Sequence, residues 1–381
     1  MTTSWNYPTA IRFGSGAIKE LPETCRALGI QNPLLVTDPM LATLPIVEQT
    51  VAIVREAGLP CGVFSDIEPN PVGTDVDKGV AVLRTGNHDG VIAFGGGTAL
   101  DVGKAIALMA HQTRPLWDFE DIGDYWTRVD ESAMVPCIAV PTTSGTGSEV
   151  GRCSVIVHTE EKRKAIIFHP NMLPPKVIAD PELTLGLPAK ITAAVGMDAL
   201  SHNLEAFCAP GFHPQADGIA LEGMKLIQRS LITAVEDGSN IEARRDMLAA
   251  SLMGATAFQK GLGAMHAMSH PLGAHLHIHH GLANAIVMPY VLQRNTSAIA
   301  DRMTELARYL NLEGTVLDWV LGLRKRLNIP HTLAEVGFTK EHCALLAPDS
   351  VKDPTAGTNP IPLTESDYTE LFRKAWCGEL Q

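Results

Sequence analysis

Several features are missing from this sequence of 381 residues, and each absence excludes a class of protein. Basic residues are in deficit, because 30 Lys and Arg stand against 42 Asp and Glu and give a net charge of -12. That balance argues against nucleic acid or an anionic membrane as a partner. No segment reaches the roughly 18 uninterrupted apolar residues of a membrane span, and the first residues form no basic region followed by an apolar run. A soluble protein without a secretory leader is expected.

The cysteines form no CxxC pair. There are seven of them, scattered along the chain, so one is left over from any pairing. Reduced thiols of this kind in a long chain indicate the cytoplasm rather than a disulfide framework. Aromatic residues are few, at 5%, but the hydrophobic fraction of 45% and the charged fraction of 19% are those of an ordinary globular protein. The length suits two domains.

The first half of the chain alternates short apolar runs with stretches of helical periodicity. Runs that are apolar at consecutive positions are typical of strands buried on both faces, and such strands form parallel sheets covered by helices. We therefore predict a doubly wound α/β domain. The expected strands are 33–37, 61–65, 90–94, 136–140 and 176–180, and the expected helices between them are 46–57, 74–84 and 98–110.

After Asp180 the strand signals stop, and a turn-rich segment, DPELTLGLPA, marks a boundary. We place one domain at 1–182 and a second, all-helical domain at 183–381. Residues 349–364 have the composition of a loop. The expected helices of the second domain are 190–207, 216–235, 241–261, 263–275, 282–293, 299–310, 314–327 and 365–376.

Three glycines, Gly95 to Gly97, join a predicted strand to a predicted helix. Glycines let the chain turn tightly there, and the free N–H groups of the new helix favour a phosphate. Thr98 and Asp101 either contribute to that site or form an ordinary N-terminal cap. A second polar loop, PTTSGTGSEVG, follows the next strand. Asp38 ends the first strand, where it either receives an adenine ribose and favours NAD over NADP, or initiates a turn before Pro39.

Histidines are concentrated in the segment GLGAMHAMSHPLGAHLHIHHG, residues 261–281, which holds six of the chain's 14. Packing alone explains such a density poorly, because each imidazole is a good metal ligand and needs a partner when buried. Asp198 and His202 lie four residues apart, as do His266 and His270, so each pair shares one face of a predicted helix. Spacing does not choose among these residues, nor among the later histidines at 275, 277, 279 and 280. It also leaves the metal open among Fe(II), Zn(II) and similar ions.

Together these motifs resemble the iron-dependent, or group III, alcohol dehydrogenases, a family that includes lactaldehyde reductase and 1,3-propanediol dehydrogenase. The likeness covers nearly the whole chain. It rests on the order and spacing of GGGTALDVGK, PTTSGTGSEV, ADPELT, GMDALSHNLEA, GLGAMHAMSHPLGA, HHGLANAIVMP and TNPIPLT. It implies a Rossmann-like domain followed by an all-helical domain, the fold also found in dehydroquinate synthase.

The resemblance also assigns roles to residues. The family's metal ligands fall on Asp198, His202, His266 and His280, and its pocket histidine falls on His270, where we expect a proton relay. It implies NAD(H) and Fe(II), or Zn(II) or another divalent ion, as cofactors, and a homodimer or larger assembly paired through residues 10–13. The dinucleotide-binding positions are Asp38, Asn70, Gly96, Gly97, Thr98, Asp101, Thr142, Thr143 and Lys164.

The chain departs from the family pattern in two places. His275, His277 and His279 are additional histidines, and His279 takes the place of a usual proline before the last ligand. Arg152 follows the second polar loop, where it either receives a substrate carboxylate or faces solvent.

We predict a dehydrogenase that interconverts a small alcohol or hydroxy acid and its carbonyl product, with the metal as a Lewis acid. The alternatives are a dehydroquinate-synthase-like lyase, a maleylacetate-reductase-like enzyme, and a noncatalytic nucleotide- or metal-binding protein.

Overall fold

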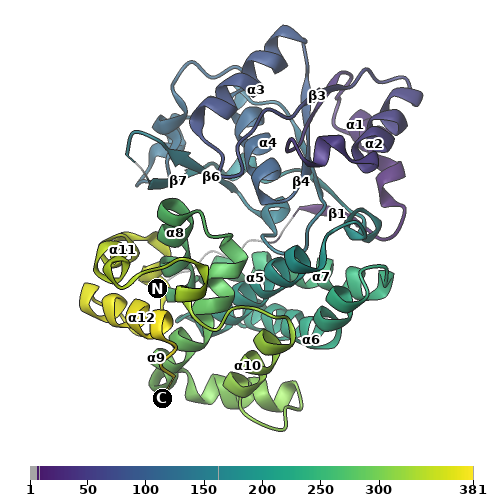
Figure 1. Ribbon diagram of the computed structural model, residues 1–381. Coiled ribbons are helices and arrows are strands. Elements are labelled where there is room, and N and C mark those ends of the chain that lie inside the picture. Colours follow the sequence, from purple (N-terminus) through teal and green to yellow (C-terminus); the bar gives the residue numbers. More distant parts are fainter. Residues whose placement is uncertain (1–6, 8, 162, 381) are drawn as a thin grey trace. The chain divides into compact units, whose positions relative to one another are not determined.

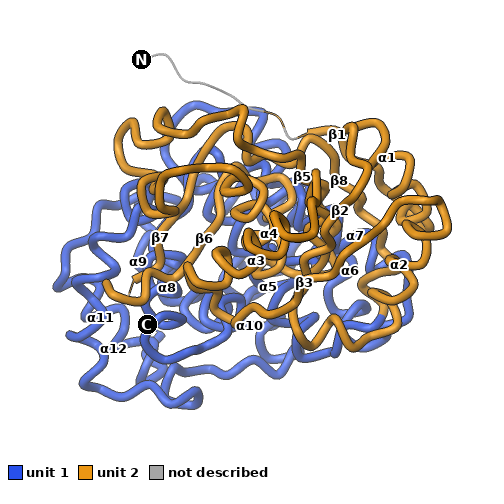
Figure 2. Tube along the Cα trace, turned by 90° about the horizontal axis from the view of Figure 1, so that it is seen from above, with its two compact units in different colours: residues 1–6, 144–146, 186–381 blue, residues 7–143, 147–185 orange. Residues whose placement is uncertain are grey.

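The computed structural model describes residues 7, 9–161 and 163–380. The chain forms two compact units, which Figure 2 shows in different colours. The α/β unit comprises residues 7–143 and 147–185, and the helical unit takes residues 144–146 and the chain from residue 186 onward. The boundary expected after residue 182 lies three residues before this one. No helix in the described part of the chain is both long and apolar enough to cross a membrane.

The α/β unit is built on a six-stranded parallel sheet with the strand order β1-β8-β5-β4-β2-β3. Figure 1 labels three of these strands, β1, β3 and β4. All five predicted strands are present, and their order leaves β1 and β3 at the two edges. The strands are β1 (Ala10–Phe13), β2 (Pro33–Val36), β3 (Gly62–Phe64), β4 (Gly90–Gly95), β5 (Cys137–Pro141) and β8 (Lys176–Ala179).

Helices cover both faces of this sheet, as the consecutive apolar runs predict. Ile92 and Phe94 point to one face and pack in a core with the helices α1 (Leu21–Ala27) and α2 (Pro45–Glu56). Ala93 points to the other face, where α4 (Gly97–Met109) approaches so closely that a Cβ on Gly103 would lie 2.5 Å from the Ala93 Cβ. The helix α3 (Gly73–Thr85) packs against α4.

An antiparallel hairpin of β6 (Cys153–His158) and β7 (Arg163–Phe168) is an element that sequence analysis missed. Its strands are buried at every second position, whereas the central strands are buried throughout. The apolar runs VIV at 155–157 and AIIF at 165–168 are the sequence signals that would have indicated it.

The helical unit contains only helices among its described residues, as expected. Its single core gathers side chains from every long helix. These helices are α5 (Ala189–Cys208), α6 (Pro214–Glu236), α7 (Ile241–Ala257), α8 (Ala264–Leu276), α9 (His280–Tyr309), α10 (Val316–Arg326), α11 (Lys340–Lys352) and α12 (Glu365–Cys377).

Two helices differ from the prediction. The segments 282–293 and 299–310 belong to one helix, α9, because the polar stretch between them stays helical and its Asn295 pairs with Asn359 in the interior. The helix α11 was not predicted, and it occupies the first part of the expected loop at 349–364. Pro348 lies inside α11, where a proline removes one hydrogen bond of the helix.

Candidate metal centre and glycine turn

Four side chains of the helical unit converge on one point. Asp198, His202, His266 and His280 each offer a ligand atom, and these atoms all lie within 4.8 Å of one another. Asp198 and His202 come from α5, His266 from α8 and His280 from the first turn of α9. The first three are buried and His280 is half-buried. The structure thus brings together the four residues that the resemblance selects, and His280 rather than His279 joins the group.

Close packing of α5 against α9 places His280 beside Asp198. A Cβ on Gly281 would lie 2.3 Å from the Ala194 carbonyl oxygen, so only glycine allows the two helices to approach this closely. As a result, His280 Nε2 lies 3.6 Å from Asp198 Oδ1. On α5, the spacing of four residues puts Asp198 and His202 on one face, as predicted.

Each of the three histidines has its Nδ1 atom engaged outside the cluster. His266 Nδ1 lies 2.6 Å from Glu205 Oε2, and His202 Nδ1 lies 3.2 Å from the Gly145 carbonyl oxygen. His280 Nδ1 lies 3.3 Å from the hydroxyl of Ser269. A ring that donates from Nδ1 keeps its lone pair on Nε2, so these partners fix the tautomer that suits metal binding.

The pKa values of the two buried imidazoles differ because their partners differ. Burial lowers the pKa of His202 to about 4, which keeps that ring neutral. Burial is also the largest effect on His266 and acts to lower its pKa, but the hydrogen bond and charge of Glu205 outweigh burial and raise the pKa of His266. A carboxylate behind a ligand histidine increases its basicity toward a metal in the same way.

Asn284 is a site residue that sequence analysis missed. Its Nδ2 donates to Asp198 Oδ1 at 2.8 Å and lies 3.3 Å from Nε2 of both His266 and His280. Asn284 follows His280 by four residues on α9, so the helical spacing that paired Asp198 with His202 would also have found it. We infer that Asn284 holds the Asp198 carboxylate in its orientation.

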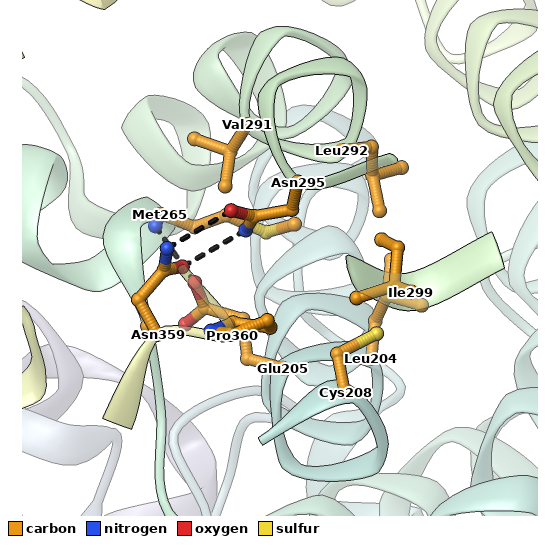
Figure 3. A pocket seen from close by; sticks show the side chains of 11 residues that line it. Leu204, Glu205, Cys208, Met265, Val291, Leu292, Asn295, Ile299, Asn359 and Pro360 are labelled. Atoms are coloured by element: carbon orange, nitrogen blue, oxygen red, sulfur yellow. Dashed lines mark hydrogen bonds between the residues drawn. The ribbon is translucent and has the colours of Figure 1, made fainter. Parts of the chain in front are cut away.

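Distant residues cap the helix that carries His266 and His270. Gly263 precedes α8 and offers no side chain, so the backbone N–H of Ala264 donates to Asn359 Oδ1 and that of Met265 donates to Glu205 Oε1. Figure 3 shows Glu205, Met265, Asn295 and Asn359 around a small pocket at this helix end. A Cβ on Gly263 would lie 2.9 Å from both capping oxygens. Asn359, from the motif TNPIPLT, therefore orients α8 and is not one of the metal ligands.

His270 lies beside the cluster without belonging to it. Its ring stacks on that of His280, with centroids 5.3 Å apart, and its Nδ1 lies 2.7 Å from Asp353 Oδ2. The three additional histidines also lie outside the cluster. His275 pairs with Asp349, His277 ends α8 in a left-handed conformation with φ 55°, and His279 directly precedes α9.

In the α/β unit, the predicted glycine turn lies between β4 and α4. Gly95 has φ +147°, and Gly96 caps α4 without a side chain, so the first N–H groups of the helix have no side-chain acceptor at the cap. A Cβ on Gly96 would lie 3.3 Å from Thr143, which places the two polar loops side by side. Such a turn at the carboxyl end of a parallel strand suits a phosphate.

Other predicted nucleotide-binding residues lie around this turn, and several of them are hydrogen-bonded to neighbouring residues of the α/β unit. Asp101 accepts from the Ser148 hydroxyl and from Val155 N, so its carboxylate joins the polar loop to β6. The Thr98 hydroxyl donates to the Pro69 carbonyl, next to Asn70. Thr142 N donates to the Gly95 carbonyl, and Thr142 is buried whereas Thr143 and Asn70 are half-buried.

Asp38 and Lys164 complete the predicted nucleotide-binding set. Asp38 Oδ1 accepts from Leu41 N at 2.8 Å, which is the turn-forming role considered above, and its Oδ2 lies 3.8 Å from a Cβ built on Gly95. The carboxylate therefore forms a turn and lies beside the glycines at the same time. Lys164 lies on β7, opposite Val157 in β6.

A buried ion pair supports the second polar loop. Lys104 Nζ donates to the carbonyl oxygens of Ser148 and Cys153 and lies 3.3 Å from Asp101 Oδ1. The neighbouring Glu149 is also buried, and its Oε1 has no hydrogen-bond partner in the described structure. Burial, opposed in part by Lys104, raises the pKa of Glu149 to about 7.

Fold and site together define a class: a parallel α/β unit with a phosphate-type glycine turn, joined to a helical unit with an aspartate and three histidines arranged as metal ligands. The model of the iron-containing alcohol dehydrogenase family matches residues 8–181, and the model of that family's C-terminal part matches residues 192–376. The chain therefore belongs to the iron-containing alcohol dehydrogenase family, and it is an oxidoreductase that acts on CH–OH groups. The family and fold class predicted from the motifs are confirmed.

Individual relatives match along nearly their whole length. The chain is 38% identical over 380 residues to 4-hydroxybutyrate dehydrogenase of Cupriavidus necator, which covers 97% of this chain and 98% of that protein. It is 36% identical over 382 residues to 1,3-propanediol dehydrogenase of Citrobacter freundii, covering 97% of each. The crystal structure of a 1,3-propanediol oxidoreductase superposes with a TM-score of 0.93 at 35% identity, over 98% of this chain and 100% of that one.

Proposed function

We propose that this protein catalyses the NAD(H)-linked interconversion of a small alcohol or hydroxy acid and its carbonyl product. The reaction uses one divalent metal ion, for which Fe(II) is the first candidate. The observation that carries the proposal is the cluster of Asp198, His202, His266 and His280 in a chain of this family. Within the proposal, residues 1–182 bind the dinucleotide, and residues 183–381 bind the metal and the substrate.

The four residues fit such an ion. One carboxylate and three imidazoles without a thiolate suit Fe(II), Zn(II) and similar divalent metals, and ligand atoms within 4.8 Å of one another can surround a single ion. The Nδ1 partners of the histidines leave each Nε2 available to it. A divalent ion bound there supplies Lewis-acid chemistry that polarises the C–O bond of the substrate.

The glycine turn supports NAD(H) as the second cofactor. The N–H groups at the start of α4 would bind the diphosphate, with Gly96, Gly97 and Thr98 around it. A negative charge at Asp38 would repel a 2′-phosphate and so favour NAD over NADP. Asp101 would act by holding the second polar loop, which carries Thr142 and Thr143. Asn70 and Lys164 complete the proposed set.

His270 is the proposed proton relay. Oxidation converts an alcohol and NAD⁺ to a carbonyl compound, NADH and a proton, with the hydride passing from the substrate carbon to the nicotinamide. The hydroxyl proton must leave, and His270 Nε2 can accept it because Nδ1 is held by Asp353. On reduction, the same nitrogen returns a proton to the carbonyl oxygen.

The relatives guide the choice of substrate. One is named 4-hydroxybutyrate dehydrogenase, and a structure 31% identical to this chain is a sulfoacetaldehyde reductase from Bifidobacterium kashiwanohense in complex with NAD⁺, so an anionic group occurs on both named substrates. Arg152 is the proposed partner of such an anionic group in this chain. It is half-buried, and its guanidinium lies 5.7 Å from the Phe168 ring.

We also propose a cytoplasmic homodimer. The edge strand β1 is short and largely exposed, with Phe13 at 42%, and a free parallel-sheet edge is a natural site for pairing with a second copy. All seven cysteines are free thiols, which suits a reducing compartment.

The direct experiment removes the metal. Chelation should abolish NAD-linked alcohol oxidation, and Fe(II) or Zn(II) should restore it, whereas full activity in the metal-free protein would contradict the proposal. His266→Ala should lose the metal, and His270→Ala should keep the metal and turn over more slowly.

A panel of 4-hydroxybutyrate, 1,3-propanediol and short uncharged alcohols, compared between wild type and Arg152→Ala, tests the substrate class. Unchanged relative rates in that variant would exclude Arg152 from recognition.

A further inference from the structure

Two histidine–aspartate pairs join α8 to α11. His270 Nδ1 lies 2.7 Å from Asp353 Oδ2, at the end of α11, and His275 Nε2 lies 2.9 Å from Asp349 Oδ2, one turn earlier on the same helix. The inner pair is largely buried, with side chains 19% and 11% exposed, and the outer pair is open to solvent, at 33% and 48%. The pairs have the same chemistry and differ in burial and in the ring nitrogen that is engaged.

Asp353 is itself firmly held. Its Oδ1 accepts from both the backbone N–H and the hydroxyl of Thr355, and the Thr355 hydroxyl also reaches the Gly263 carbonyl at the start of α8. Burial, the largest single effect, raises the pKa of Asp353, but the charge and hydrogen bond of His270 with the bonds from Thr355 outweigh it, so the pKa of Asp353 lies below its ordinary value. The carboxylate stays ionised, with one oxygen used for anchoring and the other directed at His270.

The ring of His270 is thereby fixed in two respects. An ionised carboxylate accepts only, so the nitrogen facing it carries a proton, and Nε2 is left as the basic atom of the neutral ring. The stack on His280, with an interplanar angle of 15°, sets the plane of the ring beside the ligand cluster.

We propose that Asp353 is a positioning residue for the reaction, acting through His270: it selects the tautomer with a proton on Nδ1 and so presents Nε2 as the proton acceptor. The inference rests on the proposed role of His270. The outer pair has no such role, because the carboxylate of Asp349 engages Nε2 of an exposed ring that lies outside the cluster. His275 and Asp349 join the two helices at the surface.

The substitution Asp353→Asn separates this role from a structural one. The amide oxygen of the new side chain can stay toward Thr355, which preserves the cap, while its NH2 group would face His270 and donate to Nδ1. That hydrogen bond requires the opposite tautomer, with the proton on Nε2, so the relay would lose its acceptor while the local packing stays in place. Asp349→Asn makes the same chemical change in the outer pair and is the matched control.

The kinetic test is a double-mutant cycle in the metal-loaded enzyme with Asp353→Asn, His270→Gln and the two combined. Asp353→Asn should lower kcat at least about tenfold, within the range for loss of acid–base catalysis, with a smaller change in KM. In the His270→Gln background the second substitution should change kcat less than about twofold, because a residue that acts through His270 has no effect without it. The metal content of each variant should match that of wild type. The control Asp349→Asn should have the kcat and KM of wild type.

A second measurement does not depend on turnover. Nitrogen-15 NMR of the zinc-loaded protein, with labelled histidine, reports which ring nitrogen carries the proton, and His270→Gln identifies the signals of residue 270. Wild type should show Nδ1 protonated and Asp353→Asn should show Nε2 protonated.

Each outcome decides the proposal. It is overturned if Asp353→Asn keeps kcat within about twofold of wild type, if its effect persists in full beside His270→Gln, or if the tautomer does not change. If His270→Gln is as active as wild type, the relay itself is wrong and the proposal falls with it. If wild type turns over no alcohol at all, the proposed function fails, and the tautomer measurement still shows whether Asp353 controls His270.

Discussion

The two candidate sites of this protein differ in the part of the residues that forms them, side chains in one and main chain in the other. In the helical unit, the metal cluster is made of side chains, and each histidine ligand is oriented by a further partner, such as Glu205 behind His266. In the α/β unit, the glycine turn is made of main chain, and its defining residue, Gly95, contributes a backbone angle that other residues rarely adopt. One site depends on chemistry at the tips of side chains and the other depends on the path of the backbone.

This difference follows from what each site is expected to bind. A metal ion needs ligand atoms held in a fixed geometry, so the side chains must be buried and satisfied by hydrogen bonds. A diphosphate is larger and accepts hydrogen bonds from the backbone N–H groups at the start of a helix. Its site therefore needs mainly a backbone without side chains in the way, so that the diphosphate can approach closely. Substitutions that separate the two properties test the comparison directly.

The largest effect is expected at Glu205. Glu205→Gln should weaken metal affinity by up to about 100-fold, or about 2.7 kcal/mol, because an amide cannot accept from both Met265 N and His266 Nδ1 as the carboxylate does. Metal affinity is measured by competition with a chromogenic chelator. The exposed Glu313→Gln is the control. Wild-type affinity in Glu205→Gln would show that the cluster is not held by its outer partners.

A smaller effect is expected at Glu149, a buried carboxylate of the α/β unit that lacks the partners Glu205 has. The pKa of Glu149 is raised from an ordinary 4.5 to about 7, so the folded state keeps a proton that the unfolded chain releases. Its contribution to stability is present below pH 4.5 and is lost as the pH rises through 7. Between pH 5 and pH 8 this ionisation should lower the free energy of unfolding of wild type by an amount on the order of 2 kcal/mol. Glu149→Gln, which mimics the protonated form, should not show this decrease.

Urea denaturation of wild type and Glu149→Gln at both pH values measures this difference. The two proteins should diverge as the pH rises, with the variant the more stable at pH 8. Parallel pH dependence in the two would mean that Glu149 finds a partner in solution, and the contrast with Glu205 would disappear.

The smallest effect is expected at Gly95. A Cβ there would lie 2.7 Å from the Ala99 Cβ and would sit on a backbone with φ +147°. Gly95→Ala should weaken NADH binding about tenfold, in line with a strain of ~1–3 kcal/mol, and should leave the metal content unchanged. NADH fluorescence titration and metal analysis give the two readouts. Gly218→Ala, where a Cβ meets nothing within 4 Å, is the control. Loss of metal in Gly95→Ala would break the separation of the two sites.

Much of this architecture could be read from the sequence, because local patterns carry it. Consecutive apolar runs predicted five of the six strands of the parallel sheet, and a spacing of four residues paired Asp198 with His202. The prediction was incomplete at the hairpin, whose strands it missed, and in the helices where distant residues intervene. The hairpin of β6 and β7 is buried on alternate positions only, and α9 continues through a polar stretch because Asn295 pairs with Asn359.

The sequence by itself determined the class of chemistry, since its motifs stand in the order and spacing of the iron-containing alcohol dehydrogenases. It did not decide which of the histidines gather. Only the tertiary structure brought His280 rather than His279 to Asp198, through the approach of α9 to α5 at Gly281, and only it joined His270 to Asp353 across 83 positions of chain. The physical reason is that ligand choice and proton position depend on contacts between helices, and the spacing of residues along one helix does not specify which helix it will meet.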